Sequence, residues 1–345
     1  MFIPNKKIAF RTHISMGVGL GHYSRLENLE SNLKNKAIWF ISGERETIKK
    51  IYKKKFFYVD GNLKEEIKII KYLLKNNIKN LIMDLGFKKN ISSGKIYKIQ
   101  NIYLKSGIKL ISFDDVRQRI ISNISIIPSV SSSRLISVKS NRSKVFCGHE
   151  YNFFSKFYKK KTYSNKFKKK IKNILITISG TDSKAVGFKI LRLIANKNYK
   201  FTIVSGKKIN LNLEKNKIIK KNISRINILN FVSKKNMLNQ INKSDLGICG
   251  LGIVKFDFST LQKPFILILE KNDLKNIQIK EFLKFKNCKV IIVNNNFFNS
   301  HENSQILEYI KNFQEQKKNI LNSSKYFNKK KLIKKQKNLL KEIIN

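Results

Sequence analysis

The sequence has no apolar run approaching the roughly eighteen residues that a membrane-spanning helix needs. The N-terminus passes from Lys6–Lys7 directly into the strand-like Ile8–Phe10, without the apolar core and cleavage site of a signal peptide. Cysteine is rare, and Cys147, Cys249 and Cys288 are far apart and odd in number. These absences lead us to expect a cytoplasmic protein with reduced thiols, and neither a disulfide framework nor a zinc site.

Several common catalytic signatures are also missing. The sequence contains no Gly-x-Ser-x-Gly elbow, no zinc-ligand spacing and no P-loop. It has no internal repeat beyond a weak similarity between its halves, and no long low-complexity tract. We therefore expect no metal and no cofactor.

Acidic residues are scarce compared with basic ones. The sequence has 22 Asp and Glu against 72 Lys and Arg, which gives a net charge of +50. Such a charge is typical of proteins that bind nucleic acid or anionic membranes. The excess here is almost all lysine, spread along the whole chain among Asn and Ile, whereas a nucleic-acid surface concentrates Arg and aromatic residues. We favour the interpretation that the positive charge results from a drift of the overall composition towards lysine, and not from a dedicated binding surface. We thus expect no nucleic-acid or membrane partner, and a monomer whose charge attracts an anionic substrate.

A length of 345 residues, 41% of them apolar, favours two domains. In the first half, apolar runs predict strands at 7–11, 37–42, 80–84 and 109–114, and helical spacing predicts helices at 23–35 and 62–76. In the second half, strands are predicted at 173–179, 201–205, 226–231, 246–249 and 265–269, and helices at 184–196, at 234–243 and before 260–261. Strands that alternate with helices indicate βαβ units and parallel sheets.

The lysine-rich stretch 159–172 is typical of a linker between these halves. The predicted organisation is an N-terminal Rossmann-like domain at 1–160, a C-terminal one at 172–325 and a basic terminal helix at 326–345. That helix has Leu332, Leu339, Leu340 and Ile343 at helical spacing. The expected fold class is α/β, with two doubly wound domains facing a cleft.

The first candidate site is a glycine loop between the first strand and the first helix. Gly17, Gly19 and Gly21 alternate, which lets the backbone approach a ligand closely, and His22 begins the helix, where the dipole favours an anion and a neutral imidazole. A dinucleotide site and a purely structural turn remain alternatives, although the spacing departs from the Gly-x-Gly-x-x-Gly of dinucleotide-binding loops. We favour a catalytic or substrate-binding loop, with His22 as a general base.

Two further loops have the same strand–loop–helix context in the second half. The segment 179–182 contains Gly180, Thr181 and Asp182, which suit either a diphosphate cradle or a simple helix N-cap. The segment 250–257 has an acid one turn into its helix, which suits either ribose hydroxyls or a favourable helix dipole. The predicted nucleotide-binding residues are Gly180, Thr181, Asp182, Phe231, Gly252, Ile253, Val254 and Asp257.

Carboxylates end two strands of the first half, at Asp84 and at Asp114–Asp115. Such groups can hold sugar hydroxyls, support a base or bind a metal, but their spacing matches no metal site. A turn-initiating Asp is the simpler alternative.

These motifs together resemble a known family, the UDP-2,4-diacetamido-2,4,6-trideoxy-β-L-altropyranose hydrolases of pseudaminic acid biosynthesis. The similar segments are collinear over residues 7 to 290 and comprise Phe10-Arg11, the Gly-x-Gly-His-x-x-Arg of 19–25, the strand 81–84, the Ser-Phe-Asp-Asp of 112–115, Cys147-Gly148 with Tyr151, the loop 179–182, Asp257 and Asn272. The chain departs from the family's pattern at Leu85-Gly86-Phe87, Ser179, Ile253-Val254, Asp257 and Asp273.

The resemblance implies a glycosyltransferase-B fold, with UDP in the C-terminal domain and the sugar against the N-terminal domain. It implies metal-independent hydrolysis at the anomeric carbon, with His22 activating water and Asp257 holding the ribose. The substrate contacts expected from the loops, the strand ends and the resemblance are Gly17, Gly19, Gly21, Arg25, Asp84, Asp114 and Asn272. A UDP-sugar glycosyltransferase of the same fold and a non-catalytic polyanion-binding relative are the alternative functions.

Overall fold

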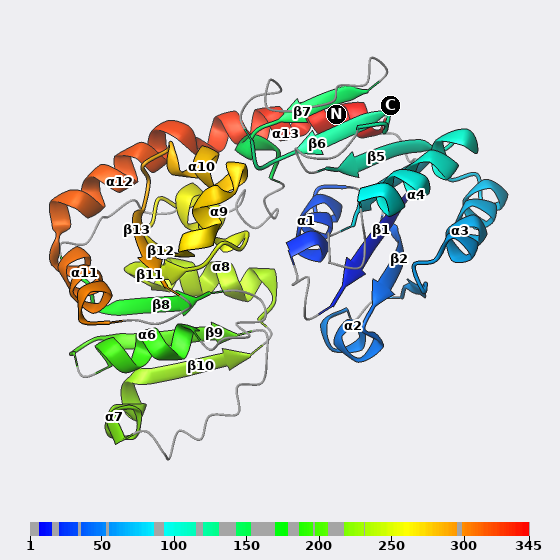
Figure 1. Cartoon of the computed structure of the whole chain (residues 1–345). Coiled ribbons are helices and arrows are strands. Elements are labelled where there is room, and N and C mark those ends of the chain that lie inside the picture. Colours follow the sequence, from blue (N-terminus) through cyan, green and yellow to red (C-terminus); the bar gives the residue numbers. More distant parts are fainter. Residues whose placement is uncertain are drawn as a thin grey trace. The chain divides into compact units, whose positions relative to one another are not determined.

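In a computed structural model of the chain, each half builds its own parallel sheet (Figure 1). The structure describes residues 7–15, 21–33, 36–52, 55–85, 93–114, 120–130, 143–152, 170–178, 186–195, 197–205, 217–230, 232–294 and 299–344. The chain divides into two units, one comprising 1–159 with 330–345 and the other comprising 160–329. The prediction of two doubly wound α/β domains is confirmed.

The sheet of the first unit has the strand order β3-β2-β1-β4-β5-β6-β7. Its strands, as far as the structure describes them, are β1 (Ile8–Ile14), β2 (Ile38–Gly43), β3 (Phe57–Tyr58), β4 (Asn80–Asp84), β5 (Lys109–Phe113), β6 (Ile124–Ile127) and β7 (Lys144–Cys147). Every neighbouring pair is parallel. The central strand β4 is buried along its whole length, which fits the apolar run of residues 81–83 at its centre.

Helices cover both faces of this sheet. The core on one face joins α1 (Gly21–Glu30), α2 (Arg45–Ile51) and α13 (Lys329–Ile344) to the strands. The core on the other face joins α3 (Leu63–Lys75) and α4 (Ser93–Lys105), and the short helix η2 (His149–Tyr151) follows β7. Helix α1 ends at Glu30, earlier than predicted, because Ser31 and Asn32 side chains bond back to the Asn28 carbonyl at 2.7 Å each.

The last helix of the chain completes the core of the first unit (Figure 1). Leu339, Leu340 and Ile343 are buried among residues of β1, β2, β4, β5 and β6. The Gln336 amide donates to the carbonyls of Glu150 (3.1 Å) and Asn152 (2.7 Å). The predicted helix is therefore present, and its apolar stripe packs on a sheet formed more than 180 residues earlier.

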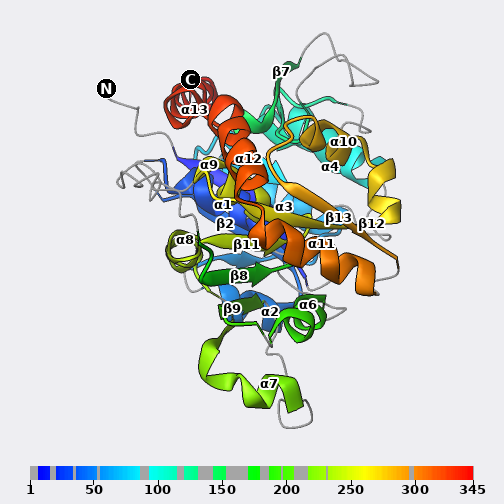
Figure 2. The same cartoon turned by 90° about the vertical axis from the view of Figure 1, so that its left-hand side faces the viewer.

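The sheet of the second unit has the order β10-β9-β8-β11-β12-β13, again all parallel. Within the described residues its strands are β8 (Asn173–Thr177), β9 (Lys200–Ser205), β10 (Ile226–Asn230), β11 (Leu246–Cys249), β12 (Phe265–Glu270) and β13 (Lys289–Val293). Its helices are α6 (Val186–Ile194), α7 (Lys217–Lys221), η4 (Ile223–Arg225), α8 (Lys234–Lys243), α9 (Val254–Thr260), η5 (Lys271–Lys275), α10 (Ile277–Leu283), α11 (Ser300–Lys311) and α12 (Phe313–Tyr326). Helices α6 and α11 pack on one face, and α8 and α9 on the other (Figure 2).

Both sheets reverse their winding direction once. In the first unit the chain passes from β1 to β2 and β3, then crosses to β4 on the opposite side of β1. In the second unit it passes from β8 to β9 and β10, then crosses to β11 beside β8. Ligands of doubly wound sheets bind at such switch points, outside the carboxyl ends of the strands. The candidate ligand positions are therefore the carboxyl ends of β1 and β4, and those of β8 and β11.

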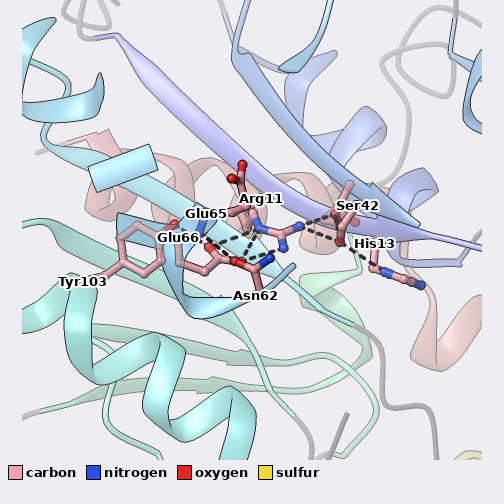
Figure 3. Close-up of polar contacts among 8 residues, drawn as sticks. Arg11, His13, Ser42, Asn62, Glu65, Glu66 and Tyr103 are labelled. Carbon is pink, nitrogen blue, oxygen red and sulfur yellow. Dashed lines mark hydrogen bonds and ion pairs between the residues drawn. The ribbon is translucent and has the colours of Figure 1, made fainter. Parts of the chain in front are cut away.

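A buried ion pair ties α3 to β1 beneath the first switch point (Figure 3). Arg11 Nε and Nη2 donate to Glu66 Oε1 at 3.0 and 2.7 Å, and Tyr103 Oη donates to Glu66 Oε2 at 2.6 Å. Arg11 Nη1 donates to Ser42 Oγ (2.9 Å), whose hydroxyl contacts His13 Nδ1 (3.1 Å). This network fixes the carboxyl ends of β1 and β2 against α3, because a buried charge needs its partners.

We predict that Leu339→Ala lowers the free energy of unfolding by about 2–5 kcal/mol, since a fully buried leucine leaves a cavity in the core. Leu74→Ala, on the exposed side of α3, is the matched control and should change stability by less than about 0.5 kcal/mol. Urea denaturation followed by circular dichroism measures both. Equal effects of the two substitutions would show that α13 does not stabilise the first unit.

Candidate active site

A histidine and a carboxylate meet at the switch point of the first sheet. His22 is the second residue of α1, after the loop that follows β1, and Asp84 is the last residue of β4. Because β1 and β4 are neighbours, with Thr12 opposite Asp84, these residues lie together: His22 Nδ1 is 2.6 Å from Asp84 Oδ1. The Asp84 side chain is fully buried, whereas the His22 side chain is 25% exposed.

Arg25, one turn further along α1, donates two hydrogen bonds to the same carboxylate. Its Nε donates to Asp84 Oδ2 and its Nη2 to Asp84 Oδ1, both at 2.8 Å. The guanidinium also lies over the Phe113 ring, 5.2 Å from its centroid, and the Arg25 side chain is 19% exposed. Such a two-point contact fixes the carboxylate in position and orientation.

The charge state of Asp84 decides the tautomer of His22. Burial by itself raises the pKa of Asp84, but Arg25 and His22 outweigh it and leave the pKa below its ordinary value. Asp84 is therefore ionised at neutral pH and can only accept hydrogen bonds. His22 Nδ1 must carry the proton that it donates to Asp84, so the lone pair of a neutral imidazole lies on Nε2.

The arrangement is that of an oriented general base. The buried aspartate fixes the orientation of the histidine ring, and in such a pair Nε2 is the atom that can accept a proton from water or a hydroxyl. The sequence predicted His22 as the base, but it predicted Asp84 and Arg25 as substrate contacts. In the structure Asp84 bonds to both His22 and Arg25, and Arg25 Nη2 lies 3.0 Å from His22 Nδ1. A direct sugar contact by Asp84 or Arg25 remains a prediction.

Asp114 lies just beyond β5 in a separate buried network. Its carboxylate accepts hydrogen bonds from Gln100 Nε2 (3.1 Å), Ser125 Oγ (2.5 Å) and Ser112 Oγ. These donors come from α4, β6 and β5, so the carboxylate links three elements. Burial is the main cause that raises the pKa of Asp114, against the lowering effect of these donors. Its predicted role as a sugar contact remains a prediction.

The third loop lies at the switch point of the second sheet. The Gly250 N–H donates to the Ile178 carbonyl at 3.1 Å, and a Cβ at Gly250 would lie 2.4 Å from that oxygen. Glycine is therefore required for the end of β11 to approach the end of β8. Gly252 follows, Ile253 is the N-cap of α9 and Val254 is its first residue, as the strand–loop–helix pattern predicts.

Asp257, in the first turn of α9, has a side chain only 1% exposed, and its Oδ2 lies 2.5 Å from Lys234 Nζ. Asn272 is exposed in η5, directly after β12. Both belong to segments at the carboxyl edge of this sheet. Lys234 was not predicted as a site residue, because nothing distinguishes it in sequence from the many other lysines.

Some predicted site residues lie outside the described residues, and so does most of the predicted linker 159–172. These site residues are Gly17, Gly19, Asp115, Gly180, Thr181, Asp182 and Phe231. Gly21 is described and begins α1.

Three features of other classes of protein are absent from the residues that the structure describes. No group of three or more His, Cys, Asp or Glu there is placed to hold a metal ion. No helix there has the length and apolarity required to cross a bilayer. Cys147, Cys249 and Cys288 form no disulfide bond.

The sequence matches no protein-family model. It is 28% identical over 299 residues to an uncharacterized protein of Methanocaldococcus jannaschii. This match covers 81% of the chain but only 58% of the longer archaeal protein.

Solved structures resemble the chain over nearly its whole length. A UDP-glucosyltransferase from Polygonum tinctorium matches with a TM-score of 0.64 and 8% identity, covering 100% of this chain and 99% of the other. MurG from Acinetobacter baumannii gives 0.58 and 11%, covering 93% and 95%. UDP-GlcNAc 2-epimerase from Neisseria meningitidis, bound to UDP-GlcNAc, gives 0.56 and 15%, covering 97% and 100%. The chain has the glycosyltransferase-B fold. The predicted fold type is therefore confirmed, while identities this low establish the fold alone.

We predict that Asp114 makes stability fall with rising pH. Its folded-state pKa lies above the unfolded value of about 4, so the folded protein binds this proton more tightly, and the stabilisation is lost as pH rises through the folded pKa. Asp114→Asn removes this titration. Urea denaturation of both proteins from pH 4 to pH 8 should therefore show the wild type losing stability relative to the variant as pH rises. A difference that is constant with pH would contradict the raised pKa.

Proposed function

We propose that the protein hydrolyses a UDP-activated sugar at its anomeric carbon and releases UDP and the free sugar. The observation that carries the proposal is the oriented His22–Asp84 pair at the first switch point, since hydrolysis needs a base for water. The fold supports the nucleotide part, because the similar structures include one with UDP-GlcNAc bound. The resemblance in sequence supports a 2,4-diacetamido-trideoxyhexose of pseudaminic acid biosynthesis as the sugar.

In the proposed reaction, His22 Nε2 accepts a proton from water as the water oxygen attacks the anomeric carbon. The bond between that carbon and the UDP oxygen breaks, and the electron pair leaves with UDP. Asp84 stabilises the imidazolium that forms, and Arg25 keeps Asp84 ionised and correctly oriented. The imidazolium then loses its proton to solvent, which restores the base. The side chains in these steps require no metal.

The second unit supplies the proposed nucleotide site. Gly252, Ile253 and Val254 at the switch point offer a close-approach loop that leads into α9. The predicted contacts in the loop after β8 belong to the same proposal, and Asn272 is proposed to contact the substrate from η5. A cytoplasmic location fits a nucleotide-sugar substrate and remains part of the proposal.

A glycosyltransferase is the second candidate, because the fold is shared with a UDP-glucosyltransferase and with MurG. The same His22–Asp84 pair would then deprotonate an acceptor hydroxyl instead of water. UDP release without an acceptor favours the hydrolase. Release that depends on an added acceptor favours the transferase.

We predict that His22→Ala lowers turnover of UDP-2,4-diacetamido-2,4,6-trideoxy-β-L-altropyranose by about 10²–10⁴-fold, the usual contribution of a positioned base. The affinity for UDP should stay within about twofold, because His22 does not belong to the proposed nucleotide site. UDP release in metal-free buffer without acceptor measures turnover, and calorimetry measures UDP binding. His301→Ala, on the exposed side of α11, is the control and should retain activity. Normal turnover in His22→Ala would overturn the assignment of the base.

We also predict that Asp84→Asn lowers kcat by about 10²-fold or more with little change in the affinity for UDP. An amide has one acceptor oxygen for the donors of His22 and Arg25, so its NH₂ group faces one of them and the histidine tautomer is no longer fixed. Asp60→Asn, at an exposed position of the same unit, serves as the control. A kcat within about threefold of the wild type would show that Asp84 does not orient the base.

A further inference from the structure

Two helices of the second unit begin at the carboxyl edge of its sheet and face each other through a lysine and an aspartate. Helix α8 follows β10, and its N-cap Ser233 accepts the Asn236 N–H at 3.3 Å, which makes Lys234 the first helical residue. Helix α9 follows β11, and Asp257 lies in its first turn. The edge strand β10 and the central strand β11 are thus linked at the end where ligands of such sheets bind.

The ion pair between these residues is almost completely buried. Lys234 Nζ lies 2.5 Å from Asp257 Oδ2, and the side chains are 13% and 1% exposed. Asp257 therefore does not extend into solvent, and almost all of the exposed surface of this ion pair belongs to Lys234. An ammonium group has three protons, so one bound to Asp257 can still donate to oxygens of an anionic ligand.

A second lysine shapes the loop beside this pair. Lys255 Nζ donates to the carbonyls of Leu251 (2.6 Å) and Gly252 (3.2 Å). In a trans peptide the N–H points opposite to the C=O, so the N–H groups of Gly252 and Ile253 point away from that ammonium. Successive N–H groups aimed the same way suit phosphate oxygens.

We propose that Lys234 supplies the cation that binds the diphosphate of the nucleotide, and that Asp257 is the positioning residue for Lys234. The inference rests on the proposed nucleotide site and assigns it a charged contact. It also changes the role expected for Asp257. A carboxylate buried against α8 and bound to a lysine acts on the nucleotide through that lysine, and does not hold the ribose directly.

The first test measures UDP affinity by calorimetry for Lys234→Met, which keeps the length of the side chain and removes its charge. Loss of a charge-assisted contact to phosphate should weaken UDP binding by about 10- to 100-fold. The UDP affinity of Lys234→Met should also depend less steeply on NaCl concentration than that of the wild type, because one attraction between opposite charges is gone. Lys234→Arg should restore most of the affinity. Lys235→Met, at the exposed neighbouring position, should behave as the wild type.

The second test is a double-mutant cycle that separates positioning from direct contact. Asp257→Asn should weaken UDP binding in the wild type but have little further effect in the Lys234→Met protein. An equal loss in both backgrounds would show that Asp257 contacts the nucleotide itself, and would overturn its positioning role. An unchanged salt dependence in Lys234→Met would assign Lys234 to structure alone.

The outcomes also separate this inference from the proposed function. A wild-type protein that fails to bind UDP overturns both. A wild type that binds UDP, with Lys234→Met binding it equally well, overturns only the role of Lys234. Urea denaturation of each variant shows whether an affinity loss follows from unfolding.

Discussion

One buried carboxylate organises the candidate active site. Asp84 has no exposed surface, yet it remains ionised because Arg25 grips both oxygens and His22 donates to one of them. Removing His22 or Arg25 leaves the fully buried carboxylate without one of its partners, which is costly. The ring of His22 is therefore fixed by the electrostatic requirements of Asp84, and the base role proposed for Nε2 depends on the same constraint. The pKa of Asp114, one strand away, shifts in the opposite direction. Its donors are neutral side chains, and their lowering effect on the pKa does not outweigh that of burial.

Much of the fold could be predicted from the sequence. Parallel strands that are buried on both faces appear as apolar runs, and in the helices between them apolar residues recur at helical spacing. The strand 80–84 and the helices at 234–243 and 329–344 were located well. Short elements such as β3 and β7 were missed, since two to four residues have too little periodicity. The end of α1 was misplaced because Ser31 and Asn32 stop it through side-chain hydrogen bonds that no apolar pattern records.

The candidate site was predictable residue by residue but not in its pairing. A histidine after a glycine loop and an aspartate at a strand end are both visible in sequence, yet 62 residues separate them. Only the strand order, which puts β4 beside β1, brings them into contact. Lys234 illustrates the opposite difficulty. In a chain this rich in lysine, composition gives no sign of the ion pair that Lys234 forms with Asp257.

The return of α13 to the first sheet has a consequence for how the protein is made. The first half of the chain leaves the ribosome long before residues 339–344 have been translated. These residues complete the core over β1, β4 and β5. Until then α1 and α2 cover only part of this apolar face, and the nascent first unit lacks α13 throughout the synthesis of the second unit. Folding in order of synthesis, the usual behaviour of tandem domains, is therefore replaced here by a late packing of α13 on the first unit. A C-terminal truncation of only a few residues would affect the domain that is made first.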